Sequence, residues 1–373
     1  MLKTTAGFIR VWDFPLRLFH WLLVLSVASA AITGYLLPVT WLQVHLIAGT
    51  VIGVLVLVRI VWGFTGSWFS RFRSFVFSPA TTIAHVKDVI AGRVHREAGH
   101  NPVGALMVFA LLICITVIVA TGVATLGGVF KQGPVKAFMS FANGMLARDV
   151  HSLFAIVLLA LIGGHLMGVI FESHRSKENL TRAMVTGGKR GGFAQAIPVV
   201  KTRYGAALSV AALLGAVLAP GAFILTGLAP SGAAAIPLNV AWQRECGECH
   251  MAFHPSLLPA KSWVAIMANL RDHFGEDASL DAVKANEISY FLTCHSAETW
   301  DSLAANRLRF VDAARPMEIT ATQFWTRMHH DIPAEVFARK TVGAKQNCSA
   351  CHADAASGMF APQDISIPQE KTE

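Results

Sequence analysis

Five long apolar segments, separated by polar connections, mark the first 229 residues of the chain. Each segment reaches the length of about 20 residues that a helix needs to cross a bilayer. Because backbone groups in lipid must satisfy their own hydrogen bonds, each segment is predicted to be a helix. The predicted spans are approximately Leu18–Leu37, His45–Phe64, Val103–Leu126, His151–Phe171 and Tyr204–Ala229. Pro220 is expected to kink or end the fifth span, and the first is interpreted as a retained helix rather than a signal peptide.

The pattern changes after the fifth span. Pro230, Ser231-Gly232 and Pro237 indicate a short linker. Shorter helices are expected beyond it, at 261–273, 279–293, 320–330 and 334–340. The predicted fold class is therefore all-α: a four-helix membrane bundle, a fifth transmembrane helix and a small, mostly helical domain. The predicted divisions are 1–175 for the bundle, 176–203 for a basic connection, 204–229 for the fifth helix, 230–241 for the linker and 242–373 for the last domain.

Composition supports a membrane protein. Hydrophobic residues make up 54% of the chain and charged residues only 14%, against about 25% charged in soluble domains. The net charge of +8 divides unevenly, with 19 basic and 6 acidic side chains before residue 230 and 12 basic and 17 acidic ones after it. The excess of positive charge thus lies in the membrane part, beside anionic lipid, and it gives no indication of nucleic-acid binding.

The distribution of basic residues predicts the orientation. Lysine and arginine gather before the first span and in the second-to-third and fourth-to-fifth connections, whereas residues 38–44 carry no charge. The positive-inside rule then places the N-terminus in the cytoplasm. After five crossings the C-terminal domain is expected in the periplasm, on the outer side of the inner membrane.

Two C-x-x-C-H pentapeptides lie in the C-terminal domain, Cys246-Gly-Glu-Cys249-His250 and Cys348-Ser-Ala-Cys351-His352. This pattern attaches a c-type haem, with both thiols bonded to the vinyl groups and the histidine bound to iron. Zinc binding or a redox disulfide would also use paired cysteines, but the histidine after both second cysteines favours haem. Attachment of haem c outside the cytoplasm agrees with the predicted orientation.

Histidines at the ends of the spans predict further metal sites, since ionisable residues in membrane helices are usually functional. His151 and His165 are 14 residues apart, so they share a face of one helix at a separation of about 21 Å. By depth, His20 matches His165 near the cytoplasmic side, and His45 matches His151 near the outer side. These pairs suit two non-covalent haems b with two histidine ligands each.

The same 14-residue step gives two further candidates. Gly34 falls on the His20 face at the depth of the outer pair, where a missing side chain leaves room for a porphyrin. Arg59 falls on the His45 face at the depth of the inner pair and is a candidate partner for a haem propionate. The alternative for Arg59 is that it extends to the lipid headgroups.

The segment from Arg10 to Trp21, with the spacing of the four helices, resembles the bacterial cytochrome b561 and nickel-hydrogenase b-type cytochrome group. The resemblance covers roughly residues 8–175. It implies a four-helix bundle that holds two haems b and exchanges electrons with membrane quinone. His20, His45, His151 and His165 match the ligand histidines of the family, whose pairing varies.

Each haem c needs a sixth ligand unless it binds substrate, and the sequence pattern alone does not choose among the candidates. They are His254, His273, His295, His329, His330, Met251, Met267 and Met317. Segments such as Pro255–Pro259 and Asp272–Gly275 resemble the bacterial dihaem cytochrome c family over nearly all of 242–368. That resemblance implies His273 and His329 as distal ligands, with His330 as the rival of His329.

The other cysteines and histidines receive structural interpretations. Cys114 is expected to pack inside the membrane, and Cys294 to be buried and inert, with pairing to another chain as the alternative. Four histidines of the basic connections are expected to be solvated, with a minor alternative of proton uptake or haem ligation. They are His85, His95, His100 and His174.

The leading functional hypothesis is an electron carrier that oxidises membrane ubiquinol or menaquinol. Electrons would pass through two haems b and two haems c to a soluble periplasmic haem protein. One alternative is an outer-surface oxidoreductase that acts on superoxide or oxygen and delivers electrons inward, and another is the haem anchor subunit of a dehydrogenase. Catalytic residues, electron direction and homodimer formation stay open, and no hydrolytic or dinucleotide motif is visible.

Overall fold

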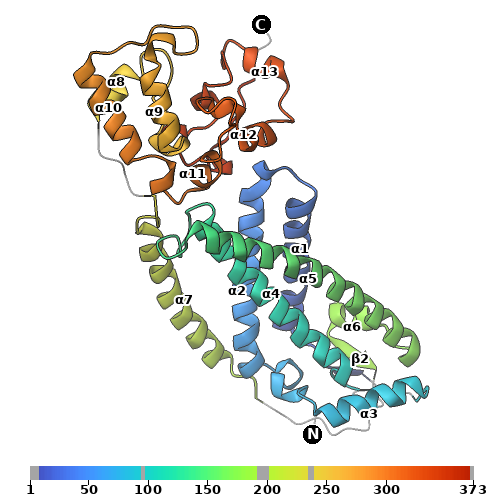
Figure 1. The fold of residues 1–373 in the computed structure, drawn as a ribbon. Helices are drawn as coiled ribbons and strands as arrows, with labels where there is room; N and C mark the ends of the chain where they lie inside the picture. Colours follow the sequence, from blue (N-terminus) through green and yellow to red (C-terminus); the bar gives the residue numbers. More distant parts are fainter. Residues whose placement is uncertain (1–7, 94–96, 191–200, 234–238, 370–373) are drawn as a thin grey trace. The chain divides into compact units, whose positions relative to one another are not determined.

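The computed structural model describes residues 8–93, 97–190, 201–233 and 239–369. Five helices of this part are long and apolar enough to span a membrane (Figure 1). They are α1 (Phe14–Tyr35), α2 (Leu42–Thr65), α4 (Pro102–Gly128), α5 (Phe141–Ser176) and α7 (Tyr204–Gly227). The five predicted spans are thus confirmed as helices. Pro220 lies inside α7 and does not end it, so of the two expected effects the kink stays a prediction.

Helix α1 begins at a carboxylate that also binds the next helix. Asp13 is the N-cap, and its Oδ1 accepts a hydrogen bond from the Leu16 backbone N–H at 2.8 Å. Its Oδ2 accepts hydrogen bonds from the hydroxyls of Ser67 and Ser70, both at 2.6 Å, and from Trp62 Nε1 at 3.1 Å. One side chain therefore caps α1 and fixes the segment that follows α2.

The core of the membrane part is a cluster shared by four helices. Ile52 and Val56 of α2 pack with Cys114 and Ile115 of α4 and with Leu158 of α5, while Leu23 and Val27 of α1 complete the cluster. Most other apolar side chains of these helices are exposed, as expected of a surface in contact with lipid. Cys114 is 3% exposed, which confirms its predicted packing role.

Small elements close the end of the bundle at which α1 begins. Strand β1 (Phe8–Arg10) pairs antiparallel with β2 (Gly188–Arg190), and α6 (Leu180–Thr186) precedes β2. Helix α3 (Pro79–Ile90) starts at the N-cap Ser78, whose hydroxyl accepts from the Thr81 N–H. These elements bring the N-terminal strand together with the connection after α5.

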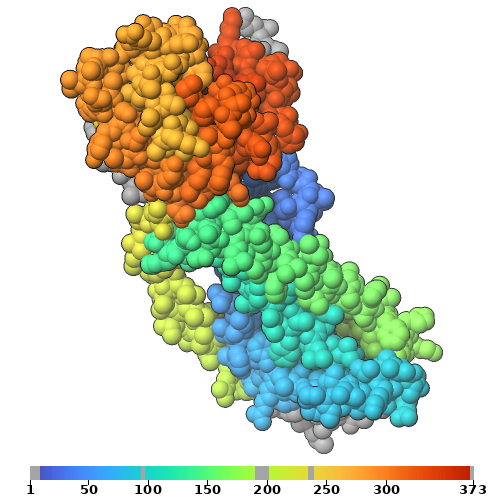
Figure 2. Space-filling view, in the orientation of Figure 1, coloured from blue at the N-terminus to red at the C-terminus, as the bar shows by residue number. Residues whose placement is uncertain are grey.

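The C-terminal domain consists of short helices that pack in two side-by-side groups (Figures 1 and 2). The first contains α8 (Val240–Glu245), α9 (Ala260–Ala268) and α10 (Ala282–Cys294), and the second α11 (Leu303–Leu308), α12 (Gln323–Met328) and α13 (Ala334–Ala338). Trp242, Trp263 and Ile288 belong to the core of the first group. Leu257 joins the groups by packing on Ala304 and Leu308.

Two compact units divide the chain in a way that differs from the sequence-predicted divisions. The first contains residues 1–122 and 148–222, and the second contains 123–147 and 223–373. The connection between α4 and α5 therefore packs with the C-terminal domain.

Candidate haem sites

His45 and His151 face each other inside the first unit. Their ring centres lie 6.2 Å apart. An imidazole nitrogen binds a first-row metal at roughly 2 Å, and with the ring centre about 1 Å behind that nitrogen, two ligands of one metal hold their ring centres about 6 Å apart. The separation therefore fits one iron between the two rings. The outer pair predicted from helix depth is brought together.

The two rings of this outer pair are oriented by matching contacts. His45 Nδ1 lies 3.0 Å from the Ala30 carbonyl oxygen, and His151 Nδ1 lies 2.9 Å from that of Ile118. Because a carbonyl oxygen only accepts hydrogen bonds, each Nδ1 must carry the proton, which leaves each Nε2 lone pair for a metal.

A Thr-Gly pair stands beside each of these rings. Thr33 Oγ1 lies 3.2 Å from His45 Nδ1, and Thr121 Oγ1 lies 3.4 Å from His151 Nδ1. A Cβ added to Gly34 would lie 3.3 Å from His45 Cε1, and one added to Gly122 would lie 3.4 Å from His151 Cε1. Gly34 thus adjoins the outer site at the depth predicted, and the atoms nearest to it are those of a histidine ring. Sequence reasoning missed Gly122 and both threonines, although the repeated Thr-Gly would have indicated them.

The inner pair is less closely matched. His20 Nδ1 is buried with no hydrogen-bond partner among the described residues. Arg59 is only 3% exposed, so the alternative in which it extends to the lipid headgroups is wrong. Its Nη1 donates to the Ser70 carbonyl at 3.1 Å, and its guanidinium lies 4.7 Å from the Phe72 ring centre.

Two histidines of the basic connections are not solvated as expected. His85 is buried. The His100 ring lies 4.8 Å from Trp12 and 4.6 Å from Phe75, measured between ring centres, and its Nδ1 is buried. Burial, followed by the positive charge of Arg59, lowers the pKa of His100 to about 3. His174 is exposed, and His95 lies outside the described residues.

The first C-x-x-C-H follows helix α8, which ends at Glu245 and has Cys246 as its C-cap. The ring centre of His250 lies 6.2 Å from that of His273, again the separation that suits two ligands of one iron. His250 Nδ1 lies 2.7 Å from the Met251 carbonyl oxygen, which leaves Nε2 for metal. Burial, and then the charge of His250, lowers the pKa of His273 and favours the neutral imidazole that iron binds.

The second motif presents the same arrangement. The ring centres of His352 and His329 are 6.1 Å apart. His329 stacks on Trp325 at 4.3 Å and donates from Nδ1 to the Trp325 carbonyl at 2.9 Å. Its neighbour His330 is exposed and pairs with Asp331 at 3.0 Å. The geometry therefore favours His329 over His330 as the group opposite His352.

The first cysteine of each motif has a thiol that is not activated for nucleophilic chemistry. Burial raises the pKa of the Cys246 and Cys348 thiols to about 11, whereas reactive C-x-x-C thiols have a lowered pKa. This difference argues against a redox dithiol. Cys294 is exposed, so the expectation of a buried thiol is wrong.

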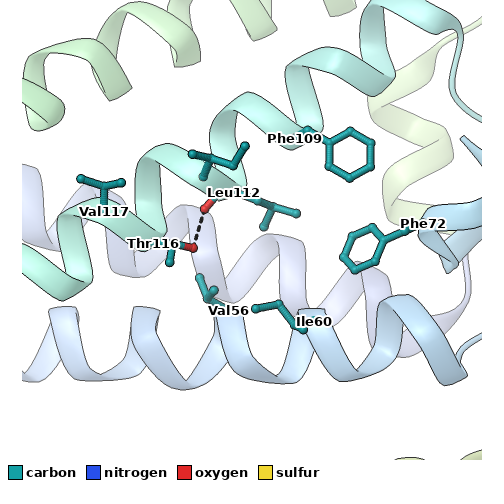
Figure 3. Close-up of a pocket in the computed structure, with 8 residues that line it drawn as sticks. Val56, Ile60, Phe72, Phe109, Leu112, Thr116 and Val117 are labelled. Carbon is teal, nitrogen blue, oxygen red and sulfur yellow. Dashed lines mark hydrogen bonds between the residues drawn. The ribbon is translucent and has the colours of Figure 1, made fainter. Parts of the chain in front are cut away.

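One apolar pocket of about 270 Å³ lies between α2 and α4 in the first unit (Figure 3). Figure 3 shows Val56 and Ile60 opposite Leu112 and Val117, with the Phe72 and Phe109 rings at one end. Thr116, the hydroxyl-bearing residue of the lining, donates to the Leu112 carbonyl at 2.7 Å. The pocket suits a hydrocarbon chain and offers little to a polar group.

The membrane bundle, the paired histidines and the two C-x-x-C-H motifs together define a membrane electron-transfer cytochrome with b-type and c-type haem. Two family matches agree. Residues 11–187 match the model of the prokaryotic cytochrome b561 family, and residues 242–360 match that of the dihaem cytochrome c family.

Curated relatives match the membrane part. A probable Ni/Fe-hydrogenase 1 B-type cytochrome subunit of Escherichia coli K12 is 25% identical over 210 residues, which cover 48% of this chain and 88% of that protein. A probable Ni/Fe-hydrogenase B-type cytochrome subunit of Cupriavidus necator is 26% identical over 212 residues and covers 48% of this chain and 85% of its own length.

Solved structures match the C-terminal domain. A dihaem cytochrome c from Rhodobacter sphaeroides is 34% identical, with 34% of this chain and all of that chain covered and a TM-score of 0.30. A dihaem cytochrome of type c from Shewanella baltica is 37% identical, with 36% and 95% covered and a TM-score of 0.29.

Proposed function

We propose that this protein carries electrons from membrane quinol, through two haems b and two haems c, to a soluble haem protein in the periplasm. The observation that carries the proposal is the recurrence of paired imidazoles. Three histidine pairs have ring centres 6.1 to 6.2 Å apart, and two of these pairs include the histidine of a C-x-x-C-H. Bound haem supplies the one-electron couple, while the protein supplies ligands, spacing and access.

We assign the ligands as four pairs. His20 with His165 and His45 with His151 hold haem b. His250 with His273 and His329 with His352 hold haem c, attached through Cys246 and Cys249 and through Cys348 and Cys351. Arg59 is proposed to pair with a propionate of the inner haem b, because it is only 3% exposed and a buried charge is unfavourable unless it is paired.

The proposed orientation, with a cytoplasmic N-terminus and a periplasmic C-terminal domain, rests on the basic connections. The acidic excess of residues 230–373, 17 acidic against 12 basic side chains, favours an electron acceptor with a basic docking face.

Haem content and quinol reduction test the proposal in the purified full chain. The pyridine haemochrome spectrum should contain haem b and haem c in equal amounts. Added ubiquinol or menaquinol should reduce haem b first and haem c afterwards. His151→Leu should lose about half of the haem b and keep all haem c, whereas His174→Leu, at an exposed position of the same helix, should lose neither. A protein that lacks either type of haem, or whose haem c stays oxidised while haem b is reduced, contradicts the proposal.

The names of the relatives favour a second candidate, a haem anchor for a dehydrogenase such as a hydrogenase. Affinity purification from mild detergent distinguishes the two functions. An anchor should bring down a large dehydrogenase subunit in stoichiometric amount, whereas a quinol oxidase should be isolated and remain active without one.

A further inference from the structure

Asp301, inside the second unit, accepts hydrogen bonds from more than one segment of the chain. Its Oδ2 accepts hydrogen bonds from Lys131 Nζ at 2.9 Å and from the Phe141 backbone N–H at 2.7 Å. Its Oδ1 accepts from Asn306 Nδ2 at 3.2 Å. Asn306 belongs to the dihaem domain, whereas Lys131 lies in the connection between α4 and α5 and Phe141 is the first residue of α5. Lys131 and Phe141 precede Asp301 by 170 and 160 residues. One carboxylate therefore binds two segments that are distant in sequence.

The burial of the Lys131 ammonium group depends on its pairing with Asp301. Its side chain is completely buried, and a buried ammonium group is strongly unfavourable unless it is paired and hydrogen-bonded. Besides Asp301 it donates to the Met139 carbonyl at 3.1 Å. Its backbone has a φ of 56°, in the left-handed region that non-glycine residues seldom adopt. The connection thus accepts an unfavourable backbone geometry at the residue that reaches Asp301.

The linker before the dihaem domain joins the same contact. The Asp301 N–H donates to the Gly232 carbonyl at 2.8 Å, and the Ser231 N–H donates to the Lys136 carbonyl at 3.0 Å. Gly232 has a φ of 67°, and a Cβ there would lie 2.3 Å from Asp301 Cβ, so no other residue fits without displacement. Three segments therefore meet at Asp301.

A second contact lies beside the first. The Arg307 guanidinium sits 5.5 Å from the Phe141 ring centre, and its Nη2 lies 3.8 Å from Met145 Sδ. Phe141 and Met145 form the first turns of α5, the helix that also carries His151 ten residues after Phe141. The dihaem domain thus contacts a helix that continues to a proposed haem ligand.

We propose that Asp301 and Lys131 form a lock that fixes the dihaem domain to the α4–α5 connection. The domain is held to this connection by the buried contact as well as by the covalent linker. The functional part of this inference rests on the proposed transfer of electrons from haem b to haem c, whereas the existence of the lock does not.

The lock is tested first without reference to electron transfer. Asp301→Asn removes the charge that pairs with Lys131, and it puts an amide donor either opposite Lys131 and the Phe141 N–H or opposite Asn306 Nδ2. Lys131→Met removes the buried positive charge. Either variant should accelerate backbone hydrogen exchange in residues 129–141 by on the order of 100-fold. Asp312→Asn is the control, because Asp312 pairs with Arg315 at 3.7 Å on the surface of the same domain. Unchanged exchange in both test variants overturns the lock.

Electron transfer within the purified full chain tests the consequence. With quinol as reductant, the rate of haem b reduction should stay the same in the Asp301→Asn variant. Reduction of haem c should slow at least about tenfold and should come to depend on solvent viscosity, because a released domain must diffuse before it accepts an electron. Faster exchange with an unchanged haem c rate overturns the claim that a fixed position serves electron transfer. If both buried substitutions prevent the protein from accumulating, Arg307→Gln serves instead, because it weakens only the contact with Phe141 and Met145. This variant should show faster hydrogen exchange in residues 129–141 and slower haem c reduction, both to a smaller extent. The absence of both changes overturns the proposal.

Discussion

Substitution of Gly34 by valine tests the outer haem b site most directly. A Cβ at this position lies 3.3 Å from His45 Cε1 and 3.5 Å from its Nδ1. The methyl groups of valine extend about 1.5 Å further, and in a helix the side chain holds one rotamer about nine times in ten. It therefore cannot readily turn both methyl groups away from the ring.

The size of the effect follows from these distances. Carbon atoms pack at about 3.5 to 4.0 Å, so the His45 ring must move by about 1 Å to admit a methyl group. A metal–nitrogen bond of roughly 2 Å does not tolerate such a displacement. Overpacking of this kind costs about 1–3 kcal/mol, which weakens haem retention by about 5- to 150-fold.

The assay is the content of haem b and haem c in purified protein. Gly34→Val should lose the outer haem b and keep the inner one, so that haem b falls by about half while haem c is unchanged. Gly163→Val is the matched control, because Gly163 is exposed on α5 and has nothing within 4 Å of an added Cβ. Full retention of both haems b in Gly34→Val would refute the assignment of His45 as a ligand.

Three further predictions concern other parts of the molecule. His329→Leu should leave one haem c five-coordinate and able to bind carbon monoxide, while His330→Leu should bind none, as spectra of the reduced protein will show; carbon monoxide binding by both or by neither contradicts the assignment. Arg59→Ala should change the midpoint potential and the retention of the inner haem b in a redox titration, and an unaltered potential and haem content argue against a propionate contact. The fold lowers the pKa of His100 from 6.5 to about 3. The neutral imidazole therefore contributes to stability above pH 6.5. Between pH 6.5 and 3 the free energy of unfolding should fall by up to about 1.4 kcal/mol per pH unit. His100→Phe, which keeps a ring between Trp12 and Phe75, should therefore flatten the fall in unfolding temperature between pH 6.5 and 4, and equal slopes for variant and parent contradict this reasoning.

The sequence predicted the membrane helices well because length and apolar character decide them. Their ends were harder to predict. Helix α5 begins at Phe141, ten residues before the predicted start at His151, since its first turns pack on the dihaem domain and the apolar pattern does not record that contact. The sequence likewise contained Asp13 only as one residue of the Arg10–Trp21 motif and did not predict its role. That role depends on hydrogen bonds from Ser67 and Ser70, which form only in the folded structure.

For the histidines too, local pattern predicted some positions, whereas others depend on tertiary contacts. Regular helix spacing was enough to pair His45 with His151, whereas the inward position of His100 depends on Trp12 and Phe75, which come from two other segments. His329 and His330 are neighbours with the same chemistry, so pattern alone could not separate them. The turn after α12 separates them, because it directs one ring toward His352 and the other toward Asp331.

The repeated Thr-Gly pair makes the outer site nearly symmetric. One helical hairpin, α1 with α2, supplies Thr33, Gly34 and His45, and the other, α4 with α5, supplies Thr121, Gly122 and His151. Two equivalent imidazoles would give a bound iron equal donor strength from the two hairpins. Neither hairpin would then dominate the electronic state of that iron, and replacing either histidine should produce the same spectral change.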